Sequence, residues 1–168
     1  MTKSDNLNDR SNILIVGIGN EFRNDDAVGI YAVRKLKKHT LPGIHTCELH
    51  YDLSGLMDMW VQYESVYVID AVSSGADAGT IHEIELDENR LSEEEFSFSS
   101  HTVSLSSIIE LSRAIHQFPK SLVIYGIEGK DFSYGCTMSD GVKEAADRLI
   151  NSLEEKLRTK ILQIEGEA

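Results

Sequence analysis

The chain has 168 residues, 41% of them hydrophobic, and its 28 acidic residues outnumber 16 basic ones for a formal net charge of −12. This length and composition fit one globular domain over residues 1–168 that buries a core of its own. The negative charge argues against nucleic acid as a partner, because nucleic acid needs a basic face, and against anionic lipid. Every apolar run falls far short of the roughly 20 residues that cross a bilayer, so no membrane association is expected.

The N-terminal arm and the two cysteines bear on where the protein works. Residues 1–11 are polar and lack the apolar segment of a secretory signal, so we expect a short disordered arm there. Cys47 and Cys136 lie far apart in sequence and form neither a C-x-x-C motif nor a zinc spacing. We therefore expect both to be small buried hydrophobic residues of a cytoplasmic protein, where thiols stay reduced.

Apolar patterning in the first half of the chain predicts strands that alternate with helices. Residues 12–16 and 66–69 are continuous apolar runs, the pattern of strands covered on both faces. Between these runs we expect, in chain order, a helix over 26–38, a break at 41–43, a strand over 44–49 and a short helix over 54–63.

The second half continues the alternation and fixes the fold class. Residues 80–86 alternate apolar and polar side chains, which predicts an edge strand or part of a hairpin. A helix over 102–117, a buried strand over 122–127 and a long helix over 140–160 follow. Strands alternating with helices predict a three-layer α/β/α sandwich around a largely parallel twisted sheet. In such sheets the ligand site forms at the carboxyl ends of the strands.

A glycine-containing loop, Gly17-Ile18-Gly19-Asn20, follows the first predicted strand. Two glycines at this spacing partly match a dinucleotide-binding fingerprint, but Phe22 stands where the third glycine would be, and no Walker pattern is present. A phosphate cradle is therefore not expected. We expect the glycines to let the chain turn off the strand, and Asn20 to hydrogen-bond the nearby backbone.

Acidic residues follow the ends of two predicted strands. Asp25 and Asp26 precede a helix, and one acid of the pair, Asp25, is expected to cap it, since Asp is favoured at helix N-termini. Asp26 is then left to point into the rim of the sheet. Asp70 ends the Val66–Ile69 run, where an acid either caps a turn or serves a site.

His101 is the histidine with the most suggestive position. It comes after Ser99-Ser100 and directly before a predicted helix, where the positive helix end disfavours the imidazolium and keeps the ring able to bind a metal. Asp26, Asp70 and His101 would suit a divalent ion with open coordination positions, such as nickel, zinc or iron. The chain has no G-x-S-x-G elbow and no H-E-x-x-H motif for other hydrolytic schemes.

At these residues the chain resembles the [NiFe]-hydrogenase maturation proteases, which trim the hydrogenase large subunit. The resemblance covers roughly residues 12–157, and its most specific part is the block from Ile13 through Gly19-Asn20 to Asp26 and Gly29. The other matching segments are the strand end Asp70-Ala71, the Ser99-Ser100-His101 segment before a helix, and the strand end Tyr125-Gly126-Ile127-Glu128.

The resemblance implies a substrate and a set of metal-contacting residues. In this family the residues matching Asp26, Asp70 and His101 contact the metal. The family acts on a large-subunit precursor that already holds nickel and removes a short C-terminal extension, after which the freed terminus closes over the active site. Nickel is then a recognition element supplied by the substrate, and no organic cofactor is implied.

Two positions depart from the family pattern. The family often has an acidic, glycine-rich turn after its second strand, and here that region reads His50-Tyr51-Asp52-Leu53-Ser54-Gly55, so Asp52 is a weak candidate for the usual acid. Ala27 replaces the glycine that usually follows the acid pair.

Two other functions stay open from the sequence. The same three ligands would suit a non-enzymatic nickel-sensing chaperone or assembly checkpoint, which would leave the precursor uncut. A peptidase of similar fold with another protein substrate is the second alternative. We expect a monomer.

Overall fold

The computed structural model describes residues 12–39, 41–50, 52–87 and 100–166, with the backbone alone described for 100–104 and 164–166. Its elements match the predicted order of strands and helices. In chain order they are β1 (Ile13–Ile18), η1 (Asn24–Ala27), α1 (Val28–Lys37), β2 (Ile44–Leu49), α2 (Leu56–Trp60), β3 (Ser65–Val72), β4 (Ile81–Asp87), α3 (Ser100–Ala114), β5 (Ser121–Glu128) and α4 (Asp140–Gly166).

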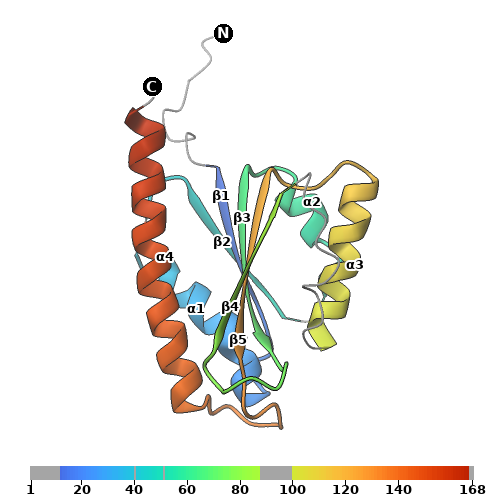
Figure 1. Ribbon diagram of the computed structural model, residues 1–168, viewed down its shortest axis with the longest axis vertical. Helices are drawn as coiled ribbons and strands as arrows, with labels where there is room; N and C mark the ends of the chain where they lie inside the picture. Colours follow the sequence, from blue (N-terminus) through green and yellow to red (C-terminus); the bar gives the residue numbers. More distant parts are fainter. Residues whose placement is uncertain (1–11, 40, 51, 88–99, 167–168) are drawn as a thin grey trace.

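The strands form one sheet in the order β2-β1-β3-β5-β4 (Figure 1). β1 pairs in parallel with β2 and β3, and β3 pairs in parallel with β5. β4 pairs antiparallel with β5 at the edge of the sheet, which confirms the prediction of an edge strand. Because β1, β2, β3 and β5 run the same way, their carboxyl ends meet at one edge of the sheet.

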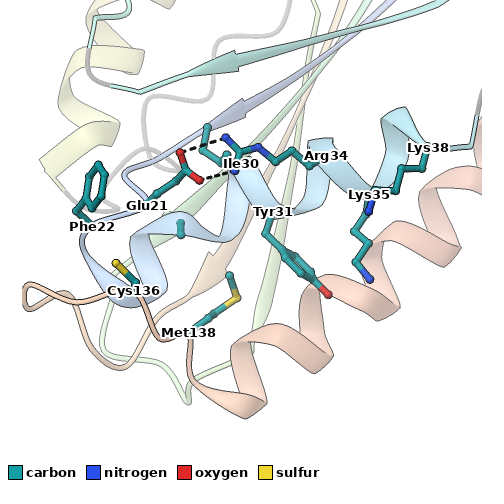
Figure 2. Close-up of a pocket in the computed structure, with 10 residues that line it drawn as sticks. Glu21, Phe22, Ile30, Tyr31, Arg34, Lys35, Lys38, Cys136 and Met138 are labelled. Carbon is teal, nitrogen blue, oxygen red and sulfur yellow. Dashed lines mark hydrogen bonds and ion pairs between the residues drawn. The ribbon is translucent and has the colours of Figure 1, made fainter.

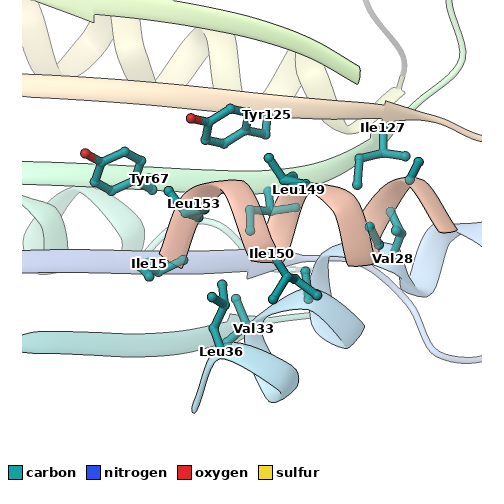
Figure 3. Packing of buried hydrophobic residues seen from close by; sticks show 14 of the residues in the cluster. Ile15, Val28, Val33, Leu36, Tyr67, Tyr125, Ile127, Leu149, Ile150 and Leu153 are labelled. Carbon is teal, nitrogen blue, oxygen red and sulfur yellow. The ribbon is translucent and has the colours of Figure 1, made fainter. Parts of the chain in front are cut away.

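Alternate residues of the central strands face opposite layers, because side chains alternate along a strand. Ile13, Ile15, Tyr67 and Ile69 belong to a core shared with α1 and α4. Figure 3 shows side chains of both helices, among them Val33 and Leu153, packed over this face of the sheet. The intervening strand residues form a second core with α2 and α3, so the predicted three-layer sandwich is confirmed.

Two element boundaries differ from the sequence prediction and affect the site. The predicted helix from Asp26 begins as the short 3₁₀ helix η1, and α1 starts at Val28. β3 runs beyond the predicted 66–69 to Val72, since its pairing with β5 continues to the Val72–Glu128 pair. Asp70 therefore lies within the strand rather than after it.

The cysteine prediction is wrong for one residue. Cys136 is exposed in the loop before α4, and Cys47 on β2 is partly buried. None of the helices in the described part of the chain is both long and apolar enough to span a membrane.

Candidate active site

Buried polar residues concentrate at the carboxyl edge of the sheet. Eight polar or charged residues are buried in the described part of the chain, and six of them lie at or just beyond the carboxyl ends of β1, β3 and β5. These six are Asn20, Asn24, Asp25, Asp26, Asp70 and Glu128. Burying carboxylates is costly unless they are hydrogen-bonded or bind a cation, so this edge is the candidate active site.

The backbone around Asp26 is held tightly against β1. Its N–H donates to the Arg23 carbonyl at 3.0 Å, and its own carbonyl accepts the Asn20 N–H at 3.1 Å. A Cβ on Gly19 would come within 2.0 Å of the Asp26 carbonyl oxygen, so only glycine permits this approach. The Asn20 side chain accepts the Phe22 N–H at 2.9 Å, as the sequence predicted for this turn. These contacts hold the Asp26 backbone in place, and the residue is 2% exposed.

Asp70 lies on the neighbouring strand at the same edge. Its Oδ1 accepts the N–H of Ala71 at 2.8 Å, and its side chain is 3% exposed. The helix η1, which carries Asp26, contacts β3. The structure therefore brings the elements that carry Asp26 and Asp70 together.

His101 lies in the first turn of α3, and its side chain is outside the described part of the structure. A short loop joins the end of α3 to the amino end of β5, so the last turn of α3 lies near the amino edge of the sheet. The first turn of α3 therefore lies toward the carboxyl edge (Figure 1). No cluster of three or more metal-ligating side chains occurs among the residues described, a set that does not include the His101 ring. The three-ligand set of Asp26, Asp70 and His101 thus stays a prediction.

Asp52 follows β2 at the same edge but is exposed. Its Oδ1 accepts the N–H of Ser54 at 2.9 Å, and hydrogen bonding from Ser54 lowers the pKa of Asp52. The carboxylate thus stabilises the turn before α2. Asp52 remains a weak candidate for the acid that the family usually has after its second strand.

The prediction that Asp25 caps its own helix is wrong. Neither η1 nor α1 has a side-chain cap, and Asp25 instead faces the loop between β5 and α4. Its Oδ2 accepts the N–H groups of Lys130 and Asp131 at 2.8 Å each, and its Oδ1 accepts that of Ser139 at 2.6 Å. The Ser139 hydroxyl donates a fourth bond at 2.9 Å. Asp25, which is fully buried, therefore anchors both ends of residues 130–139.

Asn24 holds the middle of the same loop. Its side chain donates to Asp131 Oδ2 at 3.0 Å and to Ser133 Oγ at 3.2 Å, and it accepts the Thr137 N–H at 3.0 Å. Asn24 has φ +45°, in the left-handed region that Asn tolerates better than most residues. Asn24 and Asp25 together fix the 130–139 loop beside Asp26.

Glu128 organises the other flank of this edge. Its carboxylate accepts the N–H groups of Ser74 and Gly75 at 2.7 and 3.0 Å and the Ser74 hydroxyl at 2.8 Å, and His82 Nε2 lies 3.3 Å away. Burial alone would raise the pKa of Glu128, but these hydrogen bonds outweigh it and the pKa lies below its usual value. Glu128 thus ties the loop after Asp70 to β4 and β5.

Comparison with known proteins decides the family. A family model described as hydrogenase maturation protease matches residues 30–156. The chain belongs to this family. It is therefore an endopeptidase, a hydrolase of peptide bonds.

Relatives of this protease match it along most of their own length. A Methanocaldococcus jannaschii protein assigned as a hydrogenase maturation protease is 32% identical over 162 residues, covering 90% of this chain and 91% of its own. The solved hydrogenase maturating endopeptidase HybD of Escherichia coli has a TM-score of 0.74 at 20% identity, covering 88% of this chain and 93% of that one. The [NiFe] hydrogenase maturation protease HybD of Thermococcus kodakarensis has a TM-score of 0.69 at 24% identity, covering 85% and 97%. These two structures share the fold of this protease.

The anchoring role of Asp25 predicts a pH-dependent stability. Burial alone would raise its pKa, but the hydrogen bonds from Ser139, Asp131 and Lys130 outweigh burial and hold the pKa below the ordinary 3.8. The ionised group therefore stabilises the protease above about pH 4, and this contribution disappears as pH falls through the folded-state pKa. Asp25→Asn is expected to cost about 1–3 kcal/mol in the free energy of unfolding near neutral pH, since an amide cannot accept all four bonds.

Urea unfolding of wild type and Asp25→Asn between pH 3 and 7 checks this expectation. The difference between their free energies of unfolding should shrink below about pH 4, because the Asp25 carboxyl of the unfolded wild-type chain takes up a proton there while the lowered pKa keeps the folded one ionised. A difference that stays constant over this range would contradict the role given to the Asp25 charge.

Proposed function

We propose that this protease removes the C-terminal extension of a [NiFe]-hydrogenase large-subunit precursor that already holds nickel. The observation that carries the proposal is the pair of buried acids, Asp26 and Asp70, on adjacent elements at the carboxyl edge of the sheet. The resemblance of the sequence to this family assigns a metal-contacting role to the same two acids and to His101.

The nickel of the precursor is the proposed recognition element. Carboxylate oxygens and an imidazole nitrogen suit a borderline divalent ion that keeps positions open for its own ligands. The close approach of Gly19 to the Asp26 backbone and the position of Asp70 within β3 support this role, because both residues are held by the fold before a substrate arrives. Such preorganisation reduces the entropy lost when the substrate binds.

Hydrolysis at this edge needs water, a base and a donor for the leaving amine. A water molecule adds to the carbonyl carbon of the scissile peptide and loses a proton to a carboxylate of Asp26 or Asp70, and the C–N bond then breaks as the amine takes up a proton. Nickel held by the substrate would polarise the water or the carbonyl oxygen.

Nickel dependence of cleavage tests the proposal. Purified protease is incubated with nickel-loaded precursor and, in parallel, with nickel-free precursor, and the mass of the precursor is followed by mass spectrometry. We expect the extension to be lost from nickel-loaded precursor and to be lost at least about a hundredfold more slowly from nickel-free precursor. The reason is that binding of the nickel by the protease places the scissile bond correctly.

The outcomes separate the alternatives. Equal cleavage of both precursor forms would remove nickel as the recognition element. An unchanged precursor mass with stable binding of the nickel-loaded form would indicate the assembly checkpoint instead. No binding and no cleavage would indicate a different protein substrate.

A further inference from the structure

A groove of about 480 Å³ runs along the outer face of α1 and starts next to the candidate active site. Figure 2 shows Phe22 at one end of the groove and Lys38 at the other, with Cys136 and Met138 along one side. Ala27, the residue after Asp26, also lines it. The groove therefore leads directly away from the edge that carries Asp26.

The floor and one end of the groove are apolar. Phe22 is 66% exposed and gives this end of the groove a large apolar surface. Ile30 and Met138 continue the apolar lining, and Tyr31 is held in place by a 2.7 Å hydrogen bond from its hydroxyl to Asp147 on α4. The groove thus offers apolar surface on side chains that are already positioned.

The far end of the groove is basic, in a protein of net charge −12. Glu21, the one acid in the lining, is paired with Arg34, which also contacts Glu48 at 2.8 Å. Lys35 lies over the Tyr31 ring at 5.4 Å, and neither Lys35 nor Lys38 is in an ion pair within the described part of the chain. Two lysines are therefore available to an external carboxylate.

The side of the groove that Cys136 and Met138 form is attached to the residues that precede Asp26. Gly135 N–H donates to the Phe22 carbonyl and the Asn24 N–H donates to the Gly135 carbonyl, both at 3.0 Å, which fastens the segment carrying Cys136 to the turn before η1. The side chains of Asn24 and Asp25 hold the rest of this loop. The short segment from Phe22 to Asp25 thus supports both this side of the groove and Asp26.

We propose that this groove binds the first residues of the precursor's C-terminal extension, an inference that rests on the proposed function. The nickel-bearing body of the precursor would occupy the sheet edge, and the chain beyond the scissile bond would follow α1. An apolar side chain of the extension packs near Phe22 and Met138, and an acidic side chain pairs with Lys35 and Lys38.

The dimensions of α1 limit the bound segment. Ala27 and Lys38 are separated by about 16 Å along the helix at a rise of about 1.5 Å per residue. An extended peptide covers this length in about five residues at about 3.3 Å each. The groove therefore predicts an acidic residue within about the first six residues of the extension and an apolar residue before it.

Protection of Cys136 from alkylation tests the binding step without catalysis. The protease carries Cys47→Ser, which removes the second thiol, and Asp26→Asn, which is expected to block turnover, and gel filtration first confirms that this variant still binds nickel-loaded precursor. The rate of Cys136 modification by a maleimide is measured alone, with nickel-loaded precursor and with mature large subunit that lacks the extension. We expect at least about a fivefold slower modification with precursor and no protection by mature subunit.

Charge reversal in the groove tests the predicted ion pair. The double variant Lys35→Glu, Lys38→Glu is expected to raise KM for nickel-loaded precursor about tenfold with kcat within about twofold, because the lost contact is made equally before and during the chemical step. Lys37→Glu is the matched control on the same helix, since exposed Lys37 lies outside this groove. Restoring binding with a precursor whose acidic residue is changed to Lys would assign the contact.

The results separate this inference from the proposed function. Cleavage of precursor without protection of Cys136, or an equal effect of Lys37→Glu and the double variant, would overturn the groove assignment and leave the activity intact. Protection by precursor without any cleavage by the wild-type protease would support the groove as a binding surface and overturn the proposed function.

Discussion

Asp26→Asn is expected to lower kcat/KM for nickel-loaded precursor by about a thousandfold, and Asp70→Asn by a similar factor. Each change keeps the shape of a side chain that is at most 3% exposed and removes the charge that would contact nickel or accept a proton from water. The measurement is the initial rate of release of the C-terminal extension, followed by mass spectrometry at several precursor concentrations.

Asp77→Asn is the matched control for these two variants. Asp77 is an exposed acid in the loop that follows β3 at the same edge of the sheet. The rate of precursor cleavage by Asp77→Asn is expected to stay within about twofold of wild type, as for surface substitutions away from a site. If Asp26→Asn and Asp70→Asn cleave at the rate of Asp77→Asn while folding normally, the two buried acids are not part of the catalytic apparatus.

Gly29→Ala is expected to destabilise the protease by about 3 kcal/mol, although alanine is the better helix former. Gly29 is the point where α1 meets the ends of β1 and β3. A Cβ there would lie 2.2 Å from the Ile18 carbonyl oxygen and 2.3 Å from that of Ile69. Both contacts are with backbone, which cannot move aside without separating α1 from the sheet.

The same change is expected to slow cleavage. Gly29 lies three residues after Asp26 and contacts the carbonyl of the residue before Asp70, so a shift there displaces both acids. A misplacement of about 1 Å in a catalytic group costs about a hundredfold in rate. Urea unfolding gives the stability and precursor processing gives the rate.

Gly55→Ala separates this effect from a general consequence of replacing glycine. A Cβ on Gly55 would meet no atom within 4 Å. Its free energy of unfolding is expected to change by less than about 0.5 kcal/mol. Equal stability of Gly29→Ala and Gly55→Ala would contradict the tight packing of α1 on the carboxyl ends of the strands.

The layers of this fold were predictable because they follow from local patterning. The strands β1, β3 and β5 are continuous apolar runs, as expected for strands covered on both faces. The alternation of β4 marked an edge strand with one exposed face. The order of the strands in the sheet was not predictable in the same way, since it depends on pairings between distant segments.

The candidate site was predictable in part. Asp26 and Asp70 were identifiable because each follows or ends an apolar strand in a fold that places ligands at that edge. Asp25 was misassigned because all four of its hydrogen bonds reach residues more than a hundred positions away, and local rules favour a helix cap for such an acid. The role of Asn24 depends on the same distant loop.

A crystal of this protease soaked with nickel and measured at the nickel absorption edge tests whether Asp26, Asp70 and His101 bind one ion. We expect an anomalous peak within about 2.3 Å of a carboxylate oxygen of Asp26, a carboxylate oxygen of Asp70 and a ring nitrogen of His101. A peak bound by other side chains, or a refined structure in which these three cannot reach one ion, would contradict it.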